Sequence, residues 1–88
     1  YMQFDEIFSL FAENKVKGFE AQDQANVDLA KRLHEELCEY GFDYPLDIFS
    51  TIGYSYVENV QMNERIEKFG KGTAQYICDA IQEYVGWL

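Results

Sequence analysis

Side chains that could support catalysis are few in this sequence. His34 is the only histidine, so a Ser/His/Asp or Cys/His pairing would have to use it. We expect a half-exposed structural histidine instead, because it falls beside Leu33 and Leu37 in a helical pattern. The sequence has no HExxH motif, no phosphate-binding glycine loop and no nucleophile elbow. It therefore predicts no catalytic residues and favours a protein that is not an enzyme.

Metal binding and thiol chemistry have equally little support. Cys38 and Cys78 are far apart and do not form a close CxxC pair, so we expect two reduced, mostly buried thiols. A reactive or bridging role for them is the alternative. Neighbouring carboxylates such as Glu35 and Glu36 arise readily in a chain with 16 acidic residues, and we interpret them as solvated surface. The sequence predicts neither a metal site nor a cofactor.

Aromatic residues are concentrated in the middle of the chain. The rings within residues 40–56 are Tyr40, Phe42, Tyr44, Phe49, Tyr54 and Tyr56. A small helical core cannot easily enclose so many rings, and tyrosine combines a large apolar area with a polar tip, as recognition surfaces require. We expect some of these rings to face a cleft or a partner. The alternative is that they are large core residues with their hydroxyl groups at the rim.

Length, composition and charge limit the class of protein. A chain of 88 residues that is 48% hydrophobic and 17% aromatic predicts a single folded domain covering residues 1–88. The net charge of −9 disfavours direct binding of nucleic acid or of anionic membranes. No apolar run is long enough to span a bilayer, and Asp5 and Glu6 stand where a secretory signal would be basic and then apolar. A cytoplasmic location follows as the expectation.

The elements that must position these residues are helices. Phe4, Ile7, Phe8 and Phe11 form one helical stripe, which is expected to end near Gly18. A second helix is expected to run from an N-cap at residue 23 to a stop at residue 41, and a third to begin at residue 45, a proline.

The C-terminal half predicts further helices around a glycine. The third helix carries a row of apolar residues that includes Gly53, whose presence suggests a close approach by another helix or a ligand. Asn59 is expected to cap a short helix with Met62, Ile66 and Phe69 facing inward. The last helix is expected from residue 73. Since no strand alternation is present, the fold class is all-α, a bundle of four to five short helices.

Three segments of the C-terminal half match a known pattern in register. Residues 52–57, Ile-Gly-Tyr-Ser-Tyr-Val, are similar to Leu-Gly-x-Met-Tyr-Val, and the pattern Asp-x-Arg-Phe-x-x-Asn-Ile-Asp that follows is met identically only by Ile66. The patterns Gly-x-Gly-x-Ala-x-Phe/Tyr and Ala-Ile-x-x-Tyr are met by Gly70, Gly72, Ala74, Tyr76, Ala80, Ile81 and Tyr84. The chain thereby resembles the TipAS effector domain, the antibiotic-recognition part of MerR-type multidrug-sensing transcriptional activators.

The resemblance implies a globin-like bundle around a cleft, with a role in transcription regulation. Its ligands would be antibiotics or other hydrophobic, peptide-like compounds. Members that capture thiopeptides covalently do so through a cysteine where this chain has Thr51, so we expect non-covalent recognition. Asn59 and Gln61 replace the Asp and Arg of the pattern. The resemblance therefore carries over neither an ion pair made by those two residues nor the full range of ligands.

The resemblance also bears on partners. Such regulators carry an N-terminal winged-helix DNA-binding domain and a long dimerising helix, so the chain is either an excised effector domain or a stand-alone one. A homodimer would then form through an N-terminal region that this chain lacks, and we expect no nucleic acid contact through this domain.

The expected ligand-binding residues are Tyr40, Phe42, Phe49, Thr51, Tyr54 and Tyr56. The alternative function is a protein interaction module that self-associates or docks on another protein through the same aromatic surface.

Overall fold

The structure is a computed structural model that describes residues 2–40 and 44–87. These residues form five α-helices and no strand: α1 (Met2–Val16), α2 (Gln24–Tyr40), α3 (Leu46–Glu58), α4 (Val60–Glu67) and α5 (Thr73–Trp87). The all-α prediction is confirmed, whereas the globin-like arrangement stays a prediction. Within this part of the chain, no helix is long and apolar enough to cross a membrane.

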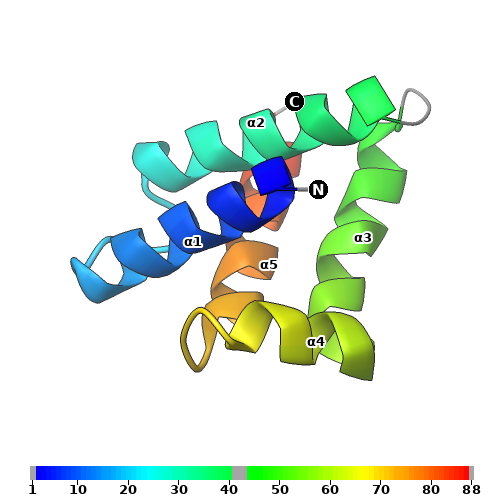
Figure 1. Ribbon diagram of the computed structural model, residues 1–88. Coiled ribbons are helices and arrows are strands. Elements are labelled where there is room, and N and C mark those ends of the chain that lie inside the picture. The colour runs from blue at the N-terminus through cyan, green and yellow to red at the C-terminus, as the bar shows by residue number, and fades with distance from the viewer. Residues whose placement is uncertain (1, 41–43, 88) are drawn as a thin grey trace.

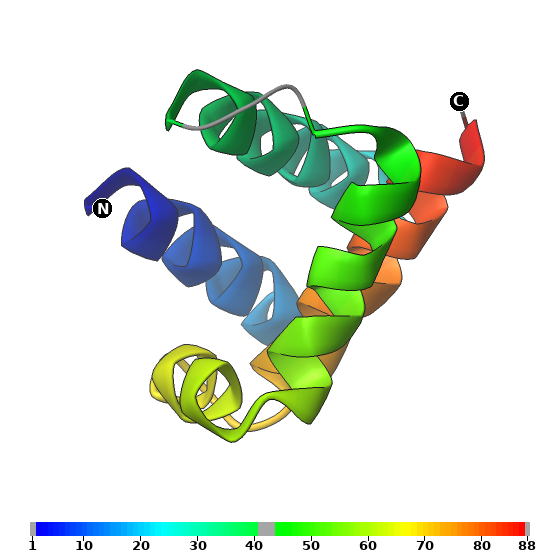
Figure 2. The same ribbon diagram turned by 90° about the vertical axis from the view of Figure 1, so that its right-hand side faces the viewer.

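Helix α5 is the centre of the packing, because it contacts all four other helices (Figure 1). Helices α1 and α2 lie side by side, and α3 packs along α5 and continues into α4 (Figure 2). The largest fully buried side chains are apolar and come from every helix. They include Ile7, Phe8, Phe11, Leu33, Phe49, Ile66, Ile77 and Ile81.

The helix boundaries follow the turn chemistry closely. Gly18, with φ +93°, follows the end of α1, as a left-handed glycine at a helix C-terminus should. Pro45 is the N-cap of α3, so that helix starts one residue later than the proline pattern predicted. The cap at Asn59 is confirmed, because its side-chain oxygen accepts the backbone N–H of Met62 at 3.0 Å. The expected stop at Gly41 lies outside the described residues.

Gly53 brings α3 and α5 together. A Cβ atom at this position would lie 3.1 Å from both Ile81 Cγ2 and Gln82 Nε2, closer than side chains normally pack. The predicted close approach of another helix at this glycine is therefore confirmed, and the neighbour is α5.

One inward-facing prediction is wrong. Phe69 is exposed, because α4 ends at Glu67 and Phe69 falls in the turn beyond the last helical residue. Glu67 itself caps α5: its carboxylate accepts the backbone N–H groups of Gly72 and Ala74 at 2.9 and 3.0 Å. This carboxylate satisfies donors that the first turn of α5 leaves unpaired.

His34 has a structural environment, as expected. Its Nε2 lies 2.7 Å from the carbonyl oxygen of Tyr44, and its Nδ1 lies 3.0 Å from the hydroxyl of Tyr84. Because a carbonyl only accepts, Nε2 carries the hydrogen in the neutral ring and Nδ1 accepts from Tyr84. The ring also stacks on Phe49 with centroids 4.6 Å apart. His34 thereby joins α2 to both α5 and the start of α3.

Candidate functional site

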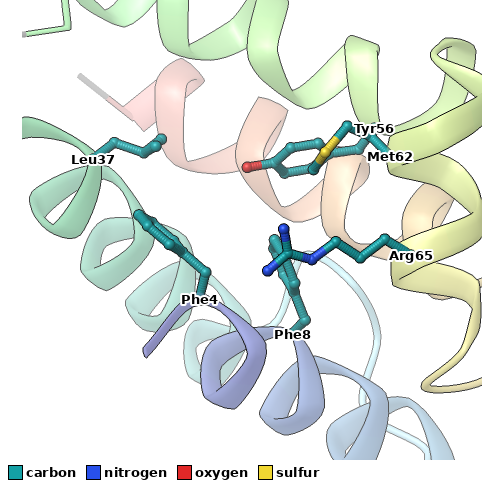
Figure 3. Close-up of a pocket in the computed structure, with 6 residues that line it drawn as sticks. All are labelled: Phe4, Phe8, Leu37, Tyr56, Met62 and Arg65. Carbon is teal, nitrogen blue, oxygen red and sulfur yellow. The ribbon is translucent and has the colours of Figure 1, made fainter. Parts of the chain in front are cut away.

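A hollow lined mostly by apolar side chains lies where α1, α2, α3 and α4 meet. It has a volume of about 150 Å³. Six side chains line it, and they come from all four helices (Figure 3): Phe4, Phe8, Leu37, Tyr56, Met62 and Arg65. Five of the six are apolar or aromatic, which is typical of small-molecule sites.

The floor of the hollow consists of rings that also belong to the core. Phe4 and Phe8 are one turn apart on α1, so both face the same side of that helix. The Phe8 ring meets Tyr56 edge to face, with centroids 5.6 Å apart and an interplanar angle of 81°. Both rings are almost fully buried, which fixes their positions. Half-buried Leu37 and Met62 complete the apolar wall.

Two polar groups enter this apolar space. The hydroxyl of Tyr56 points into the hollow, which is open to solvent on one side, and Arg65 extends from α4 toward it (Figure 3). Burial raises the pKa of Tyr56 far above its usual range, and the positive charge of Arg65 offsets that rise only in part. Arg65 Nη2 lies 2.9 Å from the Asp5 carboxylate on α1, and both side chains are about half exposed. The hollow therefore presents hydroxyl and guanidinium donors against aromatic walls.

The structure separates the residues predicted to bind ligand. Tyr56 lines the hollow, but Phe49 lies fully buried between α3 and the core, where it stacks on His34. Thr51 and Tyr54 are on the outer face of α3, with Tyr54 51% exposed. Tyr40 is the last residue of α2, and its side chain, like Phe42, lies outside the described part of the chain. The binding-site assignment of these residues stays a prediction.

Sequence reasoning missed most of the lining residues. In the sequence Phe4 and Phe8 are part of an apolar helix stripe, which predicts a core face and not a hollow. Met62 and Arg65 are three residues apart on α4, which places them on one face. No local signal indicates that this face opposes the aromatic stripe of α1, because that pairing depends on the whole fold.

The size of the hollow limits what it encloses. An apolar cavity of about 150 Å³ holds roughly one benzene ring, whereas drug-sized ligands occupy about 300–1,000 Å³. A bulky ligand would therefore place one apolar group in the hollow and extend beyond it, or separate the helices around it.

A second depression, of about 290 Å³, lies against another face of α1. It is lined by Ser9, Ala12, Glu13, Val16 and Phe69. Val16 is 87% exposed and Glu13 forms an exposed ion pair with Lys17, so Ala12 is the one buried residue among those that line this depression in the described part of the chain. We therefore consider the aromatic hollow the better candidate site.

Cys38 is half-buried and Cys78 is buried, both are free thiols in the structure, and neither lines the aromatic hollow. Cys78 is buried, and burial raises the pKa of its thiol. In the described part of the chain, no group of three or more His, Cys, Asp or Glu side chains is arranged to hold a metal ion.

Comparison with known proteins places this architecture in a family. The TipAS antibiotic-recognition domain matches residues 1–84. The HTH-type transcriptional activator mta of Bacillus subtilis (strain 168) is 29% identical over 83 residues, which cover 93% of this chain and 31% of that protein. The chain thus spans about a third of the length of this relative, and no solved structure matches it. This chain belongs to the TipAS antibiotic-recognition domain family.

Proposed function

We propose that this domain is the ligand-recognising part of a transcription regulator and binds antibiotic-like, hydrophobic compounds non-covalently in the aromatic hollow. Membership of the TipAS family and the resemblance to a transcriptional activator support the regulatory role. The observation that carries the binding proposal is the hollow itself, which combines two buried rings, Phe8 and Tyr56, with one cation at its edge.

The binding mechanism follows from how α1 is held. Near its C-terminus, Asn14 donates to the buried side chain of Asn26 at 3.1 Å, within a network that reaches α5. Near its N-terminus, the polar contacts of α1 are ion pairs between half-exposed side chains, such as Asp5 with Arg65. Exposed pairs of this kind contribute about 0–1 kcal/mol each. By its polar contacts the N-terminal half of α1 is the less firmly held half, and displacing it also exposes the buried side chains of Ile7 and Phe8, which the ligand must cover.

We propose that a ligand larger than the hollow displaces this half of α1 and orders it again over its own apolar surface. The ligand then binds one arrangement of α1 better than the other, which is the condition for shifting a conformational equilibrium. A domain attached to this one would sense the change through α1.

A thermal-shift panel of thiopeptides and other bulky natural products tests the proposal. A ligand present at about 100 times its Kd should stabilise the domain by about 2.7 kcal/mol, which raises Tm by about 10–20 °C for a chain of this size. Absence of stabilisation by every compound at saturating concentration would contradict it.

A matched pair of variants locates the site. Met62→Trp places a large ring in the hollow and should abolish the shift while the domain still folds. Val60→Trp is the control, because Val60 lies on the same helix but is 69% exposed and outside the hollow. Equal shifts in the two variants would place the ligand elsewhere.

A protein interaction module is the second candidate function. It is favoured by the exposed apolar side chains Ile48 and Tyr54 on the outer face of α3. Light scattering tests self-association through this face, since Tyr54→Ser should reduce the apparent mass of any dimer. A strict monomer at high concentration would remove the self-association form of this function.

A further inference from the structure

We propose that the hollow recognises ligands in which an apolar ring carries a carboxylate, with Arg65 and the Tyr56 hydroxyl as the groups that bind the carboxylate. This inference rests on the proposed function and adds the chemical class of the ligand. It names the part of a ligand that enters the hollow, whatever the rest of the molecule is.

The Tyr56 hydroxyl is the first observation that points to a ligand. The residue is only 4% exposed, and none of the side chains or backbone groups that the structure describes forms a hydrogen bond with its hydroxyl. The hydroxyl oxygen is not among the buried atoms that lack a partner, so water reaches it through the mouth of the hollow. The hydroxyl points into the hollow (Figure 3), so a ligand oxygen there would replace water as the acceptor of its hydrogen bond.

Arg65 is the second observation. Among the lining residues that the structure describes it is the only charged one, and its charge acts on Tyr56. Its ion pair with Asp5 joins a single nitrogen, Nη2, to one carboxylate oxygen. A guanidinium group has five N–H donors and binds a carboxylate best through two of them. Arg65 therefore retains donors for a second acceptor.

The pair with Asp5 is also easy to exchange. Both partners are about half exposed, so water weakens their attraction. A ligand carboxylate held against the apolar walls is less screened and additionally contacts Tyr56. It should therefore compete with Asp5 for Arg65, and this exchange would release α1 from α4.

Size and charge select a monocarboxylate with one ring. A volume of about 150 Å³ matches a phenyl group. Arg65, the one cation in the described part of the lining, balances one negative charge, while the net charge of −9 on the chain repels ligands that carry several. The described lining thus fits an arylalkanoate better than a phosphate ester.

The test compares two probes of nearly equal shape, 3-phenylpropanoate and its neutral analogue 3-phenylpropanamide. Binding to the intact chain is followed by two-dimensional NMR, which reports both the Kd and the residues affected. We expect both probes to perturb residues around the hollow, with the carboxylate binding about three- to tenfold more tightly.

Three variants assign the preference to named groups. Arg65→Gln should remove the preference for the carboxylate, and Asp5→Asn should strengthen carboxylate binding by removing the competing anion. Arg32→Gln is the matched control, because Arg32 forms a similar half-exposed pair with Glu6 on α1 but does not line the hollow. Tyr56→Phe should weaken both probes about threefold, since either probe offers an acceptor oxygen. Thermal melts of each variant confirm that it is folded.

The outcomes separate this inference from the proposed function. Equal Kd values for the two probes would overturn the carboxylate inference and leave a neutral ligand site intact. An undiminished preference in Arg65→Gln would overturn it as well. Absence of any perturbation at the hollow by either probe would also overturn it, while the proposed function is judged independently by the natural-product panel.

Discussion

Replacing Asn26 with alanine should destabilise the domain more than any other single hydrogen-bonding change in α2. Asn26 is fully buried, and its side-chain amide donates to the Glu20 carbonyl at 2.9 Å and to the Tyr76 hydroxyl at 2.7 Å. Its carbonyl oxygen accepts from Asn14 at 3.1 Å. Asn26 thus joins α1, the loop after it and α5.

The magnitude follows from the bonds lost. Each is worth about 0.5–1.5 kcal/mol, and the partners that remain are partly buried, so we expect a loss of about 2–4 kcal/mol. Tyr76 keeps one bond, because its hydroxyl still donates to the Phe19 carbonyl at 2.7 Å. For a domain of this size the corresponding fall in Tm is about 10–20 °C.

Urea unfolding followed by far-ultraviolet circular dichroism measures the free energy of unfolding. Gln24→Ala is the matched control, because Gln24 is in the same first turn but makes only an exposed bond to Asp28; it should cost less than about 0.5 kcal/mol. The double variant with Tyr76→Phe should lose less than the sum of the two single variants, since they share a bond. A loss below about 1 kcal/mol for Asn26→Ala would refute the view that this network anchors α1.

Three further changes test other parts of the structure. Gly53→Val should lower the free energy of unfolding, measured in urea, by about 1–3 kcal/mol, because Ile81 already lies where the new side chain would go. Gly86→Val is the control and should change stability little, because open space surrounds that position. Equal effects of the two substitutions would contradict the close approach of α3 and α5. Burial alone would raise the pKa of Glu67, but the backbone donors at the start of α5 and the charge of Lys15 lower it below its ordinary value. Its charged form therefore stabilises the fold above about pH 4.3, and this contribution is lost as the pH falls through the lowered folded-state pKa. Glu67→Gln should lower the free energy of unfolding at neutral pH and lower it progressively less in acid. A difference between the two proteins that stays constant across this pH range would exclude the capping role. A Cys38→Ala variant leaves Cys78 as the one thiol. Cys78 should react with a disulfide reagent only as fast as the domain unfolds, because the thiol is buried and burial raises its pKa. Rapid labelling of the native protein would show that α5 opens locally.

Local features of the fold were predictable from the sequence because each depends on near neighbours. The cap at Asn59 and the stripe of Phe4 and Phe8 follow from spacing along one helix. Gly53 was informative for a different reason: a glycine inside a helix is costly, so it indicates a close neighbour, although not which one.

The candidate site could not be assembled in the same way. The hollow depends on which helix faces meet, and periodicity defines a face without naming its partner. The density of rings in residues 40–56 predicts more lining residues from this segment than the hollow receives. Phe49 is enclosed by His34 and Tyr84, and Tyr54 lies on the exposed face of α3, away from the hollow. The network at Asn26 joins residues 50 apart in sequence, which no local pattern indicates.

The measurement that tests the central claim most directly is a two-dimensional NMR titration of the intact chain with a compound that raises its Tm. If the aromatic hollow is the ligand site, the largest shifts should map to the N-terminal half of α1 and to residues around Tyr56, Met62 and Arg65. Shifts confined to the outer face of α3, with the hollow unperturbed, would contradict it.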